Sequence, residues 1–136
     1  MNSKNSFNWK DFNDIADILI SLNTDAAYRT AINRYYYSTF CHARDYLVIN
    51  GIYRNKKSKI IMNSETSEVH KETREIFKES PFNHNKYIGD KIYRVLNDLR
   101  EKRNNVDYDK NASVNLNLCN YCKARSETVF ENIEKF

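Results

Sequence analysis

Residues 31–47 read Ala31-Ile-Asn-Arg-Tyr-Tyr-Tyr-Ser-Thr-Phe-Cys-His-Ala-Arg-Asp-Tyr-Leu47, and this stretch decides the fold of the chain. It lies in a longer segment, residues 26–49, that contains neither glycine nor proline. One stripe of side chains at helical spacing consists of Ile32, Tyr36, Phe40, Ala43 and Leu47. A neighbouring stripe consists of Ala31, Tyr35, His42 and Tyr46. Two adjacent apolar stripes predict a long helix buried against several partners, and Asn50-Gly51 predicts a left-handed end.

The same periodicity predicts helices on both sides of this segment. Asn8 suits the N-cap position of a first helix, whose apolar face consists of Phe12, Ile15, Ala16, Leu19 and Leu22. A short helix is expected over residues 67–79, before Pro81 stops it. Another begins near Lys86, and its buried face consists of Ile88, Ile92, Val95, Leu96 and Leu99. The last helix carries Leu118, Cys122, Val129 and Ile133.

The connections between these helices are polar. Residues 52–66 are expected to form a mobile basic loop, whose cations are Arg54, Lys56, Lys57 and Lys59. Residues 107–112 are expected to be a polar connection, with Asn111 or Ser113 capping the last helix. Asp25 is the expected cap of the long helix.

The composition agrees with an all-α fold. The 136 residues include only two glycines and one proline, and β-sandwiches, barrels and nucleotide-binding loops need more turn residues. We therefore expect one domain over residues 1–136, an up-and-down bundle of four to five helices. The net charge of +4 weakly favours an acidic partner. No apolar run approaches the ~20 residues of a membrane span, and the N-terminus lacks a hydrophobic signal, so we expect a cytoplasmic protein with reduced cysteines.

The richest polar cluster is Arg100-Glu-Lys-Arg-Asn-Asn-Val-Asp-Tyr108. On a helix, Arg100, Arg103 and Asp107 share one face, and Arg103 can reach Asp107. Guanidinium groups with polar neighbours suit a phosphate ester. The alternative is an Arg103–Asp107 ion pair that ends a helix and has no other role.

Three segments of the chain, taken in order, resemble HEPN-domain proteins. Residues 31–47 resemble the long second helix of that family, with an arginine followed by aromatic pairs. Val69-His70 leading to Phe77 is similar to its short helix with an early histidine. Residues 99–109 are similar to a segment ending in Ala-Asp-Tyr in a small stand-alone branch. Together these segments span residues 31 to 109 of the chain.

The resemblance implies a helical bundle that forms a homodimer through its long helices. Many HEPN proteins are metal-independent ribonucleases of toxin–antitoxin or anti-phage systems, and many small ones are encoded beside a minimal nucleotidyltransferase that acts as the antitoxin. By position, Arg103 matches the motif arginine of the family and Asn104 matches its polar follower. Asp107 and Tyr108 stand where the family has a histidine.

The absent histidine separates two functional hypotheses. In the first, the chain acts on RNA, with Arg103 stabilising the phosphate, Asn104 and Asp107 assisting it, and Tyr108 in the cleft. Aspartate and tyrosine are weaker proton-transfer groups near neutrality than histidine, so we expect any cleavage to be slow. In the second, the chain is a non-catalytic HEPN module that binds a nucleotidyltransferase or another effector. A helical bundle that binds a small ligand is a third reading.

Further candidates for RNA contacts are the cations Arg100, Arg34, Arg54, Lys56, Lys57 and Lys59, together with His70. For Arg34, the alternative is a stem packed on tyrosines and a head paired with a carboxylate. For His70, the alternative is a structural polar contact near the start of a helix.

Cys119-Asn-Tyr-Cys122 has the CxxC spacing of a metal or redox site. Zinc needs two more ligands, and Cys41 and His42 are the obvious candidates. Both cysteines fall in a predicted helix, where cysteine packs as a small hydrophobe. We therefore expect no metal and no cofactor.

Overall fold

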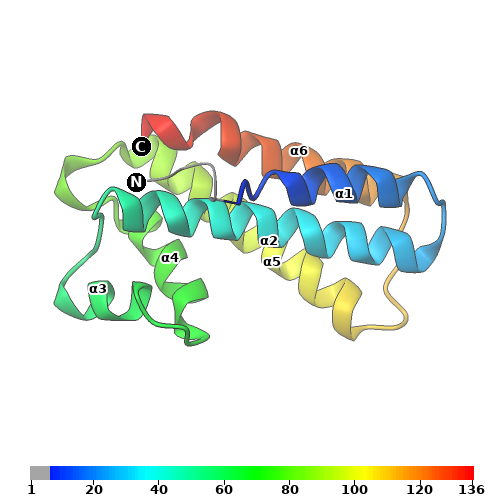
Figure 1. The fold of residues 1–136 in the computed structure, drawn as a ribbon, viewed down its shortest axis with the longest axis horizontal. Helices are drawn as coiled ribbons and strands as arrows, with labels where there is room; N and C mark the ends of the chain where they lie inside the picture. Colours follow the sequence, from blue (N-terminus) through cyan, green and yellow to red (C-terminus); the bar gives the residue numbers. More distant parts are fainter. Residues whose placement is uncertain (1–6) are drawn as a thin grey trace.

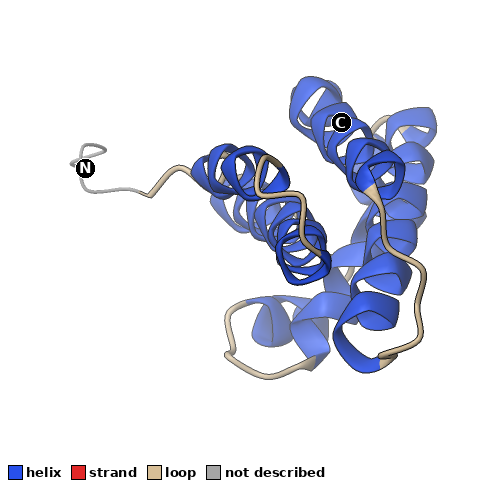
Figure 2. Cartoon of the chain, turned by 90° about the vertical axis from the view of Figure 1, so that its right-hand side faces the viewer, coloured by secondary structure: helices blue, strands red, loops and turns tan. Residues whose placement is uncertain are grey.

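The computed structural model describes residues 7–136, and in this part of the chain all regular structure is helical, without strands (Figure 1). Its α-helices are α1 (Asp11–Ile20), α2 (Asp25–Ile49), α3 (Lys56–Met62), α4 (Glu68–Glu79), α5 (Lys86–Tyr108) and α6 (Leu116–Asn132). Short 3-10 turns cover Pro81–Asn83 and Ile133–Lys135. The prediction of an all-α bundle is confirmed, with one more short helix than expected. Figure 2 shows the same helices and loops from the end of the molecule.

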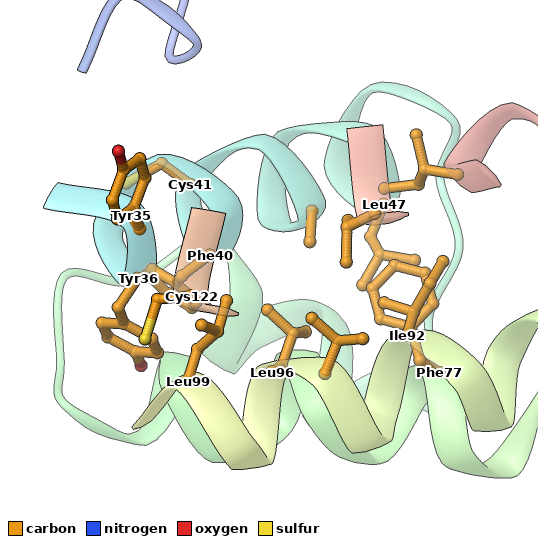
Figure 3. Close-up of a cluster of buried hydrophobic side chains, with 14 of the residues drawn as sticks. Tyr35, Tyr36, Phe40, Cys41, Leu47, Phe77, Ile92, Leu96, Leu99 and Cys122 are labelled. Carbon is orange, nitrogen blue, oxygen red and sulfur yellow. The ribbon is translucent and has the colours of Figure 1, made fainter. Parts of the chain in front are cut away.

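Helix α2 is the centre of the bundle. It packs against α1, α5 and α6 and also contacts α4, while α3 lies against α4 (Figure 1). All five residues of the stripe from Ile32 to Leu47 are buried, as predicted. They meet the buried face of α5 in the core drawn in Figure 3, where Leu99 lies close to Tyr36 and Cys122. Fully burying a side chain of this size contributes about 1.5–3 kcal/mol, so the wide apolar surface of α2 explains its central place.

Several helices are capped by residues other than those predicted from the sequence. Thr24, not Asp25, caps α2, because its Oγ1 accepts a hydrogen bond from the backbone N–H of Ala27 at 3.2 Å. Asn115, not Asn111 or Ser113, caps α6. Asn8 lies outside α1, which starts after Lys10 without a side-chain cap. At the other end of α2, Gly51 has a φ of 64°, which confirms the predicted left-handed position.

The prediction of a mobile loop over residues 52–66 is wrong, because this segment contains the short helix α3. The Asn55 side chain caps it by accepting a hydrogen bond from Ser58 N–H at 2.8 Å. Ile52 and Met62 are buried and fasten its two ends to the core. The charged residues between them hide this short helix in the sequence, because a helix of two turns is stabilised mainly by such tertiary contacts.

Helix α1 is rotated relative to the predicted apolar face. Ile15 and Leu22 are 50% and 60% exposed, whereas Asn13 is buried. Asn13 donates a hydrogen bond to Ser126 Oγ at 3.0 Å and accepts one from Ser38. Because these partners satisfy the buried amide, a polar side chain occupies the inner face that periodicity assigns to apolar residues.

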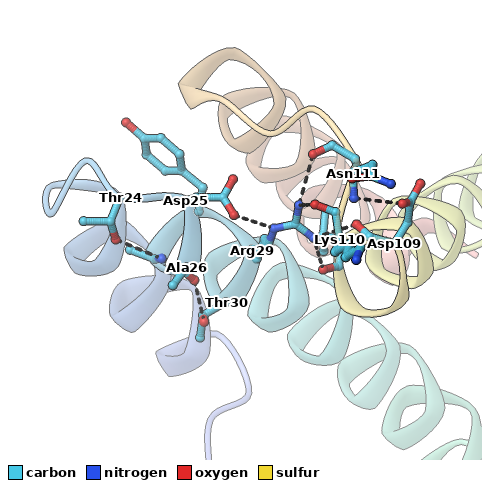
Figure 4. A network of polar contacts seen from close by, with 12 residues as sticks. Thr24, Asp25, Ala26, Arg29, Thr30, Asp109, Lys110 and Asn111 are labelled. Carbon is cyan, nitrogen blue, oxygen red and sulfur yellow. Dashed lines mark hydrogen bonds and ion pairs between the residues drawn. The ribbon is translucent and has the colours of Figure 1, made fainter.

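Arg29 ties the connection between α5 and α6 to the start of α2 (Figure 4). Its Nε donates to Asp25 Oδ2 at 2.7 Å. Its two terminal nitrogens donate to four backbone carbonyls, those of Val106, Asp109, Lys110 and Ala112, at 2.7–3.3 Å. An arginine has five N–H donors, and all five of Arg29 are used. The sequence reading missed this residue.

Candidate anion-binding site

Helices α2, α4 and α5 bring together three arginines, which we call the arginine cluster: Arg74, Arg100 and Arg103. Arg74 comes from α4, and the other two come from α5. The positive charges of all three act on the pKa of both Tyr36 and His70, so all three arginines lie near these two side chains. The fold therefore adds Arg74 to Arg100 and Arg103, the two arginines that the sequence grouped on one helix face.

Arg103 is the most firmly held member of the arginine cluster. Its guanidinium carbon lies 4.8 Å from the centre of the Tyr36 ring and 5.4 Å from that of Tyr37. Its Nη1 donates to Tyr37 Oη at 3.2 Å, and its Nε donates to Asn104 Oδ1 at 3.0 Å. Stacking on aromatic rings fixes the guanidinium plane, which suits directional contacts with a phosphate.

The predicted Arg103–Asp107 pair is present but long. The Nε–Oδ2 distance is 3.9 Å, and the same carboxylate oxygen accepts a hydrogen bond from Asn33 Nδ2 at 2.9 Å. A carboxylate at this distance offsets only part of the arginine charge. The ion-pair alternative for Arg103 thus corresponds to a contact in the structure. It does not explain the presence of Arg74 and Arg100 beside Arg103.

Arg74 and Arg100 form no ion pair and no hydrogen bond with any residue from 7 onward. The Nη1 atom of Arg74 is buried without a hydrogen-bond partner in that part of the chain. Burial, followed by the charge of Arg100, lowers the pKa of Arg74, whereas Tyr36, Tyr93 and Glu75 act in the opposite direction. A partly buried guanidinium with an unused donor costs folding free energy, and an incoming anion would relieve that cost.

His70 lies beside the arginine cluster, packed on α2. Its ring stacks on Phe40 at 3.9 Å between centroids, and its Nδ1 is 2.6 Å from Tyr36 Oη. Burial, followed by the charges of Arg103, Arg74, Arg100 and Arg44, lowers the pKa of His70 to about 4. Burial also raises the pKa of Tyr36 to about 12. At neutral pH both groups are therefore uncharged.

The other predicted residues near the arginine cluster differ in their surroundings. Asn104 contacts Arg103 as described above, whereas the Tyr108 side chain is 80% exposed and forms no hydrogen bond with the described residues. Arg34 stacks on Phe12 and Tyr37, at 5.0 and 5.3 Å, and donates to Asn33 rather than to a carboxylate. Since Arg34 and Arg103 share the Tyr37 ring, Arg34 extends the cationic surface along α2.

The basic segment around α3 does not join the arginine cluster. Arg54 pairs with Glu72 at 2.7 Å and with Glu79 at 3.2 Å. On α4, Glu72 and Arg74 are two residues apart, so they lie on nearly opposite sides of the helix. Arg54 is thereby neutralised on the far flank of α4. The lysines of this segment are exposed on α3; they are Lys56, Lys57 and Lys59.

The three cysteines are buried, free thiols. Burial raises the pKa of Cys119 to about 11 and that of Cys122 to about 12, so both thiols stay protonated. From Phe7 to the C-terminus, no group of three or more His, Cys, Asp or Glu side chains is placed to hold a metal ion. Both cysteines of the CxxC pair in α6 lie in the buried core of the bundle.

Sequence reasoning missed Arg74, Tyr36 and Tyr37 as members of this site. The available signal was the spacing of His70 and Arg74, which are four residues apart and so share one face of α4. Tyr36 was correctly predicted to be buried, but its contacts with Arg103 and His70 depend on how three helices pack.

Comparisons with protein-family models, curated proteins and solved structures find no match for this chain. No helix in the described residues is both long and apolar enough to span a membrane.

Proposed function

We propose that the chain is an RNA-binding protein of the HEPN type, and that the arginine cluster binds the phosphodiester backbone. One observation carries this proposal: Arg74 and Arg100 converge with Arg103 and have no carboxylate partner in the described residues. Like charges that are brought together without counter-charges are costly unless an anion binds them.

An extended polyanion fits this surface better than a single phosphate does. Arg34 continues the row of cations beyond Tyr37, and the charge of Arg44 acts on His70 from the other side. Several guanidinium groups spaced along α2 and α5 can contact successive phosphates of one strand. Such binding weakens steeply as salt concentration rises.

Metal-independent cleavage is the second candidate function, and the position of His70 favours it. The segment around Arg103 contains no histidine, but His70 of α4 lies beside the arginine cluster. The His70 Nδ1 atom contacts the Tyr36 hydroxyl, and Arg103 packs on the ring of the same tyrosine. A neutral imidazole can accept a proton, but a pKa of about 4 makes it a weak base. We therefore expect binding to dominate and cleavage to be slow. A homodimer would place two arginine clusters in one assembly, and a nucleotidyltransferase or other effector remains a proposed partner.

The test is to measure binding and cleavage of a labelled single-stranded RNA by the purified protein in EDTA. We expect Arg103→Ala to weaken binding at least tenfold. Arg94→Ala is the matched control, because Arg94 is exposed on α5 about half a turn away from Arg103 around the helix axis. If both variants bind like the wild type, or both weaken equally, the arginine cluster is not the binding site.

The same samples test the second function. Cleavage that leaves a 2′,3′-cyclic phosphate, and that is lost in both Arg103→Ala and His70→Gln, would support catalysis. RNA that is bound but stays intact would leave the chain a binding module.

A further inference from the structure

A second site lies away from the arginine cluster, where residues 7–9 cross the C-terminal end of α2. The hollow has a volume of about 340 Å³ and is lined by Phe7, Asn8, Trp9, His42, Asp45, Tyr46, Ile49, Asn50 and Glu134. This volume is within the range of small-molecule sites. Three of its walls are aromatic rings, those of Phe7, Trp9 and Tyr46, and none of the lining residues is a lysine or an arginine.

The aromatic wall is held in place. Trp9 Nε1 donates a hydrogen bond to Asp45 Oδ2 at 2.5 Å, which fixes the indole orientation. Phe7 meets Trp9 edge to face, with the ring centroids 5.2 Å apart. The guanidinium carbon of Arg44 lies 5.8 Å from the Trp9 ring. The rings are therefore positioned before any ligand arrives, which reduces the entropy lost on binding.

The electrostatics of this hollow favour a cation. Asp45 is paired with Arg44 at 3.0 Å, which offsets its charge, but Glu134 forms no ion pair in the described residues. Glu134 is one of the residues that line the hollow, and its negative charge acts to raise the pKa of both Tyr46 and His42. Burial lowers the pKa of His42, so this ring is neutral at pH 7 and does not repel a cation.

The end of α2 adds to this field. Ile49 and Asn50 belong to the C-terminal end of a helix of 25 residues that has no basic side chain in its last turn. The aligned peptide dipoles of a helix give its C-terminal end a partial negative charge, which attracts cations. Aromatic faces attract cations as well, most strongly when the cation is poorly hydrated.

We propose that this hollow binds an alkylammonium group, with the rings of Phe7, Trp9 and Tyr46 enclosing its methyl groups and Glu134 balancing its charge. The group can belong to a small free cation or to a methylated lysine side chain of a partner protein. None of the residues that line this hollow belongs to the arginine cluster.

The chain offers a direct reporter, since Trp9 is its only tryptophan. We would titrate the wild-type protein with tetramethylammonium chloride at constant ionic strength and follow Trp9 fluorescence. The expected result is a saturable change at millimolar concentrations. Tert-butanol, a neutral molecule of similar shape, should bind at least tenfold more weakly.

Variants separate charge from shape. Glu134→Gln should weaken tetramethylammonium binding about three- to fivefold, and the control Glu131→Gln, whose side chain is exposed and does not line the hollow, should leave it unchanged. Tighter binding of a trimethyllysine peptide than of tetramethylammonium would identify a protein partner, and the reverse order would identify a small molecule. Equal binding of tert-butanol, no saturation, or no effect of Glu134→Gln would overturn the proposal.

Discussion

Two arginine sites in this molecule use the same side chain in opposite ways. Arg29 has every donor satisfied by Asp25 and four backbone carbonyls. Arg74 has a buried donor without a partner in the described residues, and Arg100 beside it has no counter-charge there. The first arrangement stabilises the fold, and the second leaves binding capacity unused. The comparison teaches that the function of an arginine depends on which of its donors the fold leaves free.

The largest expected effect is on stability, at Arg29. Arg29→Met removes five hydrogen bonds and leaves partly buried carbonyls without donors, so we expect the free energy of unfolding to fall by about 2–4 kcal/mol. Urea denaturation followed by circular dichroism measures this.

A milder change tests the same network. Asp25→Asn changes only the exposed partner of Arg29 and should cost no more than about 0.5 kcal/mol. If Arg29→Met costs no more than Asp25→Asn, the backbone contacts of Arg29 contribute little to stability.

The next effect separates function from stability at Arg74. Arg74→Met keeps the apolar stem and removes an incompletely satisfied cation, so we expect unchanged or slightly higher stability. RNA affinity should fall about tenfold, because one guanidinium–phosphate contact is lost. Fluorescence anisotropy with labelled RNA measures the affinity, and urea denaturation measures the stability. A large loss of stability would show that Arg74 has the same structural role as Arg29.

The pH dependence of stability tests whether burial and the arginine cluster lower the pKa of His70. The pKa of His70 is about 4 in the folded chain, against an ordinary value of 6.5. The unfolded chain therefore binds more protons between these values, and stability falls as the pH drops from about 6.5 to 4. We expect protonation of His70 to lower the free energy of unfolding by about 1–2 kcal/mol. The effect is not larger because solvent reaches part of the ring and screens the charges.

The variant His70→Phe should flatten this slope, while His42, whose pKa burial also lowers, keeps part of it. Denaturation at a series of pH values gives the slope. Identical slopes in wild type and variant would contradict the assigned environment of His70.

The smallest effect concerns Asp107, the one carboxylate among residues 7–136 that pairs with Arg103. Asp107→Asn retains an oxygen to accept the hydrogen bond from Asn33 but removes the negative charge. We expect RNA affinity to rise two- to threefold and stability to change by less than about 0.5 kcal/mol. Weaker binding would mean that Asp107 contacts RNA or orients Arg103 for it. Anisotropy at low salt detects either result.

The fold was largely predictable, because burial follows helical periodicity. The stripe from Ile32 to Leu47 and the buried face of α5 both lie where the pattern placed them. Helix α3 was missed because its ends are fixed by tertiary contacts of Ile52 and Met62 rather than by periodicity. The face of α1 was misjudged because the partners of Asn13 come from α2 and α6.

The candidate site was only partly predictable. Arg100, Arg103 and Asp107 lie in one helix, so their spacing was enough to group them. Arg74 joins them only through the packing of α4 against α5 and α2, which a single sequence does not specify. The ion pair of Arg54 with Glu72 was not foreseen either, because Glu72 lies in a different helix.

The central claim is that the arginine cluster binds phosphates, and the salt dependence of RNA affinity tests it most directly. The wild type, Arg74→Met and Arg94→Met would be compared from about 50 to 200 mM salt by fluorescence anisotropy. If the arginine cluster binds phosphates, the slope of log affinity against log salt concentration becomes shallower by about one in Arg74→Met and stays unchanged in Arg94→Met. Equal slopes in all three proteins, or a change only in Arg94→Met, would contradict it.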